Sequence, residues 1–200
     1  GGKTAIAVNI GLHVAKQGAP VLFISLETDS DELGLRAYAS EAKINGDRYL
    51  LNELSKIERE DFEDTMDRMA GVKFEIDDEA ASLAGIRSKL RKFVRENGKC
   101  GLLIIDYLQI MDAPKAERHD LAIGELTKGL KNIAKDFKIP VLCLVQIGRE
   151  ADGQKPTLKG MQGSGKIEND ANFILVLHRE PKTTNDVSSE CEAVTAIILT

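Results

Sequence analysis

The chain begins Gly1-Gly2-Lys3-Thr4, directly before a helical pattern of apolar residues. These residue types match the end of the phosphate-binding loop G-x-x-x-x-G-K-[ST], which leads into a helix. In that loop the lysine places positive charge on the β and γ phosphates, the hydroxyl residue ligates Mg²⁺, and the first helical N–H groups face the anion. The pattern therefore predicts ATP and Mg²⁺ as ligands, with Gly1, Gly2, Lys3, Thr4 and Ala5 as the ATP-binding residues.

Three apolar runs end in side chains that nucleotide hydrolysis requires, namely a metal-binding acid, a group that orients water and a group that senses the γ-phosphate. Asp106 ends "GLLIID", Glu27 ends "VLFISLE" and Gln146 ends "VLCLVQ". A buried acid is costly without a partner, so Asp106 and Thr4 are expected to hold Mg²⁺. Glu27 would polarise the attacking water, and Gln146 would contact the γ-phosphate. Each residue alone also fits a turn cap or a solvated loop, but their shared place at strand ends favours a nucleotide hydrolase.

The elements that must position these residues follow from the apolar periodicity. Helices are expected at 4–17, 30–43, 47–70, 82–97 and 120–137. Strands are expected at 20–27, 72–77, 101–110, 140–146, 172–178 and 193–199. Ser82 can cap a helix, and Asn45-Gly46 is a turn signal. Helices alternating with buried strands predict an α/β fold, with a mostly parallel central sheet covered by helices on both faces.

The composition is that of a globular protein, with 42% hydrophobic and 30% charged residues. No apolar run approaches the ~20 residues that a membrane span needs, so no membrane is expected as a partner. The three cysteines and three histidines are scattered, which predicts reduced cytoplasmic thiols and no Cys/His metal site. The formal net charge of −5 gives no overall attraction to nucleic acid. Any contact with nucleic acid must therefore come from a local basic patch.

Six segments together resemble the ATPase motor domain of the bacterial replicative DNA helicase (DnaB) family, which has a RecA-like P-loop NTPase fold. They are GKTAIAVNIGLHVA, FISLETDSDELGLR, RSKLRKF, LLIIDYLQI, LTKGLKNIAKDFKIPVLCLVQIGR and GSGKIENDAN. The resemblance covers nearly the whole chain and implies a single motor domain over residues 1–200. It also implies a ring, usually a homo-hexamer, with ATP between subunits and single-stranded DNA in the channel. A primase and a helicase loader are further partners in such a system.

The resemblance gives Lys3, Thr4, Glu27, Asp106 and Gln146 the roles already named. It adds one catalytic residue, because Arg36 matches the arginine that faces the nucleotide from the helix after the Glu27 strand. The family's arginine finger and its lysine partner lie just after the last strand, whereas this sequence stops at "AIILT". We therefore expect the sequence to be truncated at both ends, inside the phosphate loop and before the finger.

The family's DNA-contacting loop reads R-E-S-G-S-I-E-Q-D-A-D, and the matching stretch here is "QGSGKIENDAN". Gln162 and Gly163 replace the Arg and Glu, while Lys166 adds a positive charge. Backbone N–H groups near Gly163 and Gly165 can still contact phosphate, since they need no side chain. The surrounding stretch, 149–166, is locally basic. The expected DNA-binding residues are Arg149, Gln162, Gly163, Gly165 and Lys166.

Three functions fit this sequence. The leading one is an ATP-driven motor that translocates on single-stranded DNA and unwinds duplex. The second is a RecA-like ATPase of the recombination or signalling kind, without helicase activity. The third is an interaction module switched by ATP, such as a helicase-loading partner. The segments "SLE…LR" and "GSGKIENDA" favour the helicase, and Glu27 with Gln146 argues against a switch that rarely hydrolyses. Fold alone would not separate the three.

Overall fold

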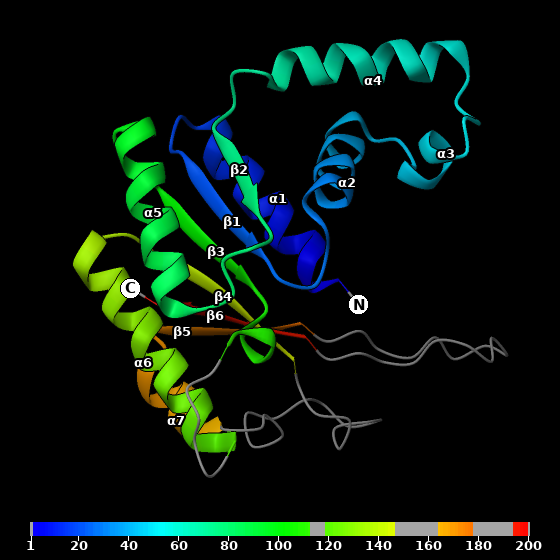
Figure 1. The fold of residues 1–200 in the computed structure, drawn as a ribbon. Helices are drawn as coiled ribbons and strands as arrows, with labels where there is room; N and C mark the ends of the chain where they lie inside the picture. The colour runs from blue at the N-terminus through cyan, green and yellow to red at the C-terminus, as the bar shows by residue number, and fades with distance from the viewer. Residues whose placement is uncertain (1, 113–118, 147–163, 178–193, 200) are drawn as a thin grey trace, which may run out of the picture.

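The computed structural model describes residues 2–112, 119–146, 164–177 and 194–199. Its centre is a sheet of six strands in the order β2-β1-β3-β4-β6-β5 (Figure 1). The strands are β1 (Val21–Ser25), β2 (Phe74–Asp77), β3 (Leu102–Asp106), β4 (Val141–Gln146), β5 (Phe173–Leu177) and β6 (Val194–Leu199). Strands β1 to β4 pair in parallel, while β6 is antiparallel to both β4 and β5. The predicted mostly parallel sheet is confirmed, with an antiparallel pair at one edge.

Helices cover both faces of this sheet, as predicted (Figure 1). They are α1 (Lys3–Lys16), α2 (Ser30–Ala42), α3 (Gly46–Leu50), α4 (Lys56–Met69), α5 (Leu83–Asn97), α6 (His119–Phe137) and α7 (Ser164–Asp170), with the short 3₁₀ helix η1 (Leu108–Ile110). Helices α1 and α2 lie on one face, and α5 and α6 on the other. Helices α3 and α4 lie beyond α2, away from the sheet (Figure 1). None of the helices in the described ranges is long and apolar enough to cross a membrane.

Strand β3 shows why the centre of the sheet is buried on both sides. Leu103 and Ile105 belong to the core under α5 and α6, whereas Leu102 and Ile104 belong to the core under α1 and α2. All five residues of β3 are buried, and so are all five of β1. An uninterrupted apolar run is what a strand between two helical layers requires. A polar residue at the end of such a strand therefore emerges at the edge of a dry core.

Local capping explains several helix boundaries, and the structure corrects some of the expected ones. The single helix expected at 47–70 is two helices, because Ser55 caps the start of α4. The strand expected at 101–110 ends at Asp106, and η1 follows it. Ser82 caps α5 as predicted, because its Oγ accepts a hydrogen bond from the N–H of Gly85 at 3.1 Å. The Asn45-Gly46 pair does not form a free turn, because the Asn45 side chain accepts from the N–H of Asp47 and begins α3. A further correction is that 164–170, expected as part of a loop, forms α7. Helix formation there buries Ile167 completely in the core beneath α6.

Candidate nucleotide-binding site

The polar ends of three strands come together at one edge of the sheet. Strands β1, β3 and β4 are adjacent and parallel, so their carboxyl ends emerge side by side. Asp106 is the last residue of β3, Gln146 is the last of β4, and Glu27 follows β1 by two residues. Ser25 is the register partner of Asp106. The carboxyl edge of a parallel sheet is where ligands bind in open α/β folds.

Thr4 brings the start of α1 to the same edge. Its Oγ1 donates a hydrogen bond to Asp106 Oδ2 at 2.6 Å, across 102 residues of sequence. Gly2, just before the helix, has a φ of 136°, a backbone conformation that a residue with a Cβ rarely adopts. The sequence-predicted phosphate loop residues and the acid at the end of β3 are therefore in direct contact.

Asp106 is completely buried, and its other carboxylate oxygen, Oδ1, has no hydrogen-bond partner. Among the described residues, Asp106 Oδ1 is the one buried side-chain oxygen or nitrogen that lacks a hydrogen-bond partner. Burial raises the pKa of the Asp106 carboxyl, more than the hydrogen bond from Thr4 and the charge of Lys3 lower it. An unpartnered buried carboxylate oxygen is energetically costly unless a ligand pairs with it.

A hydroxyl and a carboxylate oxygen side by side are donors that Mg²⁺ accepts. In the described part of the chain, no group of three or more His, Cys, Asp or Glu residues is placed to hold a metal. Two protein ligands are nevertheless sufficient, because Mg²⁺ commonly takes its other ligands from water and substrate phosphates. The donor set of Thr4 and Asp106 thus fits Mg²⁺ bound together with a nucleotide.

Lys3 lies against Tyr107, the residue after Asp106. Its Nζ is 4.3 Å from the centroid of the Tyr107 ring, a distance at which a cation is attracted to the aromatic face. Burial, with the charges of Glu27 and Asp106, raises the pKa of the Tyr107 phenol, which keeps the ring neutral. Sequence reasoning missed Tyr107. Its signal was only its place beside Asp106 at the end of the most apolar strand.

Glu27 lies exposed on the turn between β1 and α2, and this turn is anchored on both sides. The N–H of Leu26 donates to the backbone oxygen of Asp106 at 2.8 Å. At the start of α2, the N–H of Ser30 donates to Asp78 Oδ2, also at 2.8 Å. The Glu27 charge contributes to raising the pKa of Asp106, so it acts within the same site. An exposed carboxylate on an anchored turn can meet a water molecule at the strand ends.

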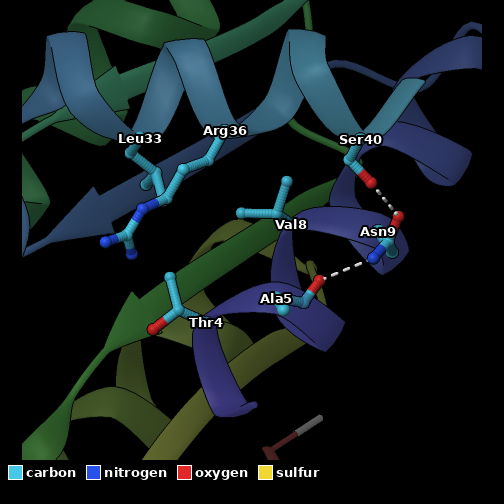
Figure 2. A pocket seen from close by; sticks show the side chains of 7 residues that line it. All are labelled: Thr4, Ala5, Val8, Asn9, Leu33, Arg36 and Ser40. Carbon is cyan, nitrogen blue, oxygen red and sulfur yellow. Dashed lines mark hydrogen bonds between the residues drawn. The ribbon is translucent and has the colours of Figure 1, made fainter. Parts of the chain in front are cut away.

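Arg36 lines a cavity of about 200 Å³ between α1 and α2 (Figure 2). The cavity is lined by Thr4, Ala5, Val8, Asn9, Leu33, Arg36 and Ser40. The Arg36 side chain is 55% exposed, and its guanidinium pairs with Glu32 on the same helix, Nη2 to Oε1, at 2.5 Å. An exposed ion pair of this kind is weakly stabilising, so the guanidinium is easily redirected toward an anion. Arg36 thus lines the same cavity as the phosphate-loop residues Thr4 and Ala5, and its contact with the nucleotide stays a prediction.

Gln146 is exposed at the end of β4, and a second glutamine holds its backbone. Gln109, within η1, donates from Nε2 to the backbone oxygen of Gln146 at 2.9 Å. It also accepts from the N–H of Gln146, at 3.2 Å from Oε1. Gln109 was not predicted, because nothing in the sequence shows that its side chain reaches the neighbouring strand.

The candidate DNA-binding residues lie only partly within the described chain. Arg149, Gln162 and Gly163 lie outside the described residues, as does the ATP-binding candidate Gly1. Gly165 and Lys166 lie in the first turn of α7, and both are exposed.

Contacts between α7 and α6 fix the direction of the Lys166 side chain. A methyl group added at Gly124 of α6 would come within 3.2 Å of Lys166 Cγ, so the lysine stem lies directly over this glycine. Asp170 accepts a hydrogen bond from the Thr127 hydroxyl at 2.6 Å. Lys166 is therefore an exposed residue on a helix that contacts α6 at both of these points.

Two of the cysteines lie in the described residues, and both are free and buried. Burial raises the pKa of the Cys100 thiol to about 11. It also raises the pKa of Cys143, with a smaller contribution from the Asp106 charge. These thiols stay protonated and act as core residues rather than nucleophiles.

Comparison with known proteins gives a family match along the whole chain. The family described as DnaB-like helicase C terminal domain matches residues 1–200. A probable replicative DNA helicase from Trieres chinensis is 34% identical, over 99% of this chain and 45% of that protein. The replicative DNA helicase DnaB of Pasteurella multocida is 32% identical, over 99% of this chain and 44% of that protein. The chain thus spans less than half the length of these relatives.

Two solved structures share the fold. One, described as an ATPase domain, has a TM-score of 0.81 at 24% identity, covering 90% of this chain and 66% of that one. The other is a DnaB-like replicative helicase, described together with its interactions with primase. It has a TM-score of 0.80 at 25% identity, covering 90% of this chain and 44% of that one. Both likenesses confirm the predicted RecA-like fold. With its full length matched and its phosphate-loop residues in contact with the acid of β3, the chain belongs to the DnaB-like helicase C-terminal domain family.

Proposed function

We propose that this chain is the ATP-hydrolysing motor domain of a ring-shaped replicative DNA helicase that translocates on single-stranded DNA and unwinds duplex. The observation that carries the proposal is the buried Asp106 carboxylate, hydrogen-bonded to Thr4 through one oxygen and without a partner at the other. A protein that did not bind a metal–nucleotide complex here would gain nothing from this costly arrangement. Membership of the DnaB-like helicase family supports a helicase, rather than another kind of nucleotide hydrolase, as the function of this site.

Each residue of the site has one task in the proposed reaction. Lys3 pairs with the β and γ phosphates, and Thr4 and Asp106 hold Mg²⁺. Mg²⁺ held by these two residues would neutralise negative charge on the reacting phosphate group. Glu27 orients the attacking water and accepts its proton. Gln146 donates a hydrogen bond to the γ-phosphate from the neighbouring strand.

The site is open on its outer side, which supports a ring in which a neighbouring subunit completes it. Glu27, Arg36 and Gln146 are all exposed. Phosphoryl transfer needs positive charge at the transition state, commonly an arginine supplied from outside the phosphate loop. We propose a homo-hexamer with ATP at the subunit interfaces and the neighbour supplying this charge. A primase, a helicase loader and a cytoplasmic location complete the proposed setting, and the buried free thiols are in keeping with that location.

The test of this function is strand separation by the intact protein on a forked duplex with a single-stranded tail. We expect separation with Mg²⁺ and ATP, and none with a non-hydrolysable ATP analogue or with EDTA. ATP turnover stimulated by single-stranded DNA, but without strand separation, would instead identify a RecA-like ATPase of another kind. Nucleotide binding with no turnover at all would point to an ATP-switched module.

Lys166→Glu should weaken binding of single-stranded DNA by the assembled ring. The Lys166 ammonium is exposed on α7, so it can contact a phosphate without reading a base. Binding should fall alike for all sequences, and the salt dependence should decrease by about one phosphate contact per bound subunit. Fluorescence anisotropy over a salt series measures both quantities.

The matched control is Lys99→Glu, which makes the same charge change at an exposed lysine. Lys99 lies just before β3, at the amino ends of the parallel strands and away from the candidate nucleotide site. It should leave both affinity and salt slope unchanged, and nucleotide binding should persist in both variants. An unaltered affinity and slope in Lys166→Glu would show that the strand does not pass α7.

A further inference from the structure

The segment from Asp106 to Gln109 contacts the nucleotide site at three separate points. Asp106 accepts a hydrogen bond from Thr4, and the Tyr107 ring lies under the Lys3 ammonium. Gln109 reaches in the other direction, to the end of β4. The first two contacts are made to the phosphate loop. The third is made to the residue proposed to sense the γ-phosphate.

Gln109 replaces a strand that is missing at this point of the sheet. The register of β3 with β4 ends at the pair Ile105 and Cys143, three residues before Gln146. On its other side Gln146 is the register partner of Val194 in β6. The side-chain amide of Gln109 supplies one donor and one acceptor to the free side of Gln146, as a neighbouring strand would.

We propose that Gln109 is a positioning residue for ATP hydrolysis, which holds the backbone of Gln146 so that its side chain meets the γ-phosphate. This inference rests on the proposed function. A single hydrogen bond would allow Gln146 to pivot, whereas one bond to its N–H and a second to its backbone oxygen restrain both of its peptide planes. Misplacement of a reacting group by about 1 Å can cost about a hundredfold in rate. Gln146 is exposed at the end of β4, and β3 no longer pairs with this strand beyond Ile105 and Cys143.

The contact is better suited to positioning than to stability. Both hydrogen bonds lie at the exposed surface, where water replaces them at little cost when they are lost. A merely structural role would appear as a lower melting temperature, whereas a positioning role would appear in kcat. The two explanations therefore give different measurements on the same variant.

The first variants are Gln109→Ala and Gln109→Glu in the intact protein. We expect kcat for ATP to fall about tenfold in each, with KM changed by no more than about twofold and the melting temperature close to that of the parent. Gln109→Glu keeps the size of the side chain and can accept from the N–H of Gln146. It cannot donate to the backbone oxygen, and it sets two oxygens against each other. A kcat near the parent value in both variants would overturn the proposal.

The variant Gln146→Ala separates two failures. One is a failure of the positioning role of Gln109, called the clamp, and the other is a failure of the γ-phosphate contact of Gln146, called the sensor. If Gln146→Ala slows turnover while both Gln109 variants do not, the sensor role stands and the clamp is wrong. If Gln146→Ala has normal turnover, the sensor role in the proposed function fails, and the clamp with it. The double variant Gln109→Ala/Gln146→Ala should be no slower than Gln146→Ala, because Gln109 acts through that side chain. A further tenfold loss in the double variant would show that Gln109 acts elsewhere.

Discussion

Glu27→Gln is expected to leave ATP binding intact and to lower ATP turnover by about a hundredfold or more. The amide has the size and polarity of the carboxylate, but it cannot accept a proton from the attacking water. The turn that carries Glu27 is anchored by two hydrogen bonds, from the N–H of Leu26 to the backbone oxygen of Asp106 and from the N–H of Ser30 to the Asp78 carboxylate. Neither bond uses the Glu27 side chain. The geometry should therefore survive the substitution.

The measurement is single-turnover hydrolysis of ATP beside equilibrium binding of a fluorescent nucleotide analogue. Glu79→Gln is the matched control, because Glu79 is another exposed acid at the same edge of the sheet, just after β2. The control should hydrolyse ATP normally. Turnover within a few-fold of normal in Glu27→Gln would make Glu27 a bystander, and Asp29 would be the next acid to test.

The residues that could be predicted from the sequence share one property, their position at the end of an apolar run. Asp106 and Gln146 are recognisable because a parallel strand between two helical layers must be apolar until it leaves the sheet. Thr4 is recognisable because the phosphate loop has a fixed spacing. The contact of Thr4 with Asp106 then follows from the adjacency of α1 and the parallel strands.

The site residues that the sequence did not predict are in place because their side chains contact elements that are distant in sequence. Gln109 meets Gln146 only because β3 and β4 are neighbours and β3 is the shorter at that edge. Tyr107 meets Lys3 only because α1 starts above the end of β3. Neither amide nor phenol groups have a diagnostic spacing, so no linear pattern marks them. The antiparallel direction of β6 was equally hidden, since buried parallel and antiparallel strands have similar apolar runs.

Asp106→Asn should abolish function while stabilising the protein without its ligands. The amide is a poor substitute for a carboxylate as a ligand of Mg²⁺. Loss of a residue that only supports a metal ligand costs about 10- to 100-fold, so loss of the ligand itself should lower Mg²⁺-dependent nucleotide binding and turnover by more than about a hundredfold. Asp112→Asn, at an exposed acid just after η1, is the control and should change neither.

The effect on stability follows from the pKa of Asp106, which burial raises above its usual value. A raised pKa means that the folded state binds the proton more tightly than the unfolded state does. The protonated carboxyl therefore supports folding at acid pH, and this support is lost as the pH rises through the folded pKa. At neutral pH, without Mg²⁺, the folded protein carries the cost of a buried charge with an unpartnered oxygen. Asparagine carries no such charge, so the free energy of unfolding of Asp106→Asn should exceed that of the parent.

Urea unfolding in EDTA, at neutral pH and at a pH near the ordinary Asp pKa, measures the free energy of unfolding with the carboxyl charged and with it protonated. The advantage of Asp106→Asn should be largest at neutral pH and should shrink as the pH falls. Added Mg²⁺ and nucleotide should stabilise the parent but not the variant, because a ligand raises stability only through the state that binds it. A variant less stable than the parent at neutral pH in EDTA would mean that the Asp106 charge is compensated within the protein. The ligand would then not be what completes the site, and the cost of that buried charge would no longer argue for a metal–nucleotide complex at the end of β3.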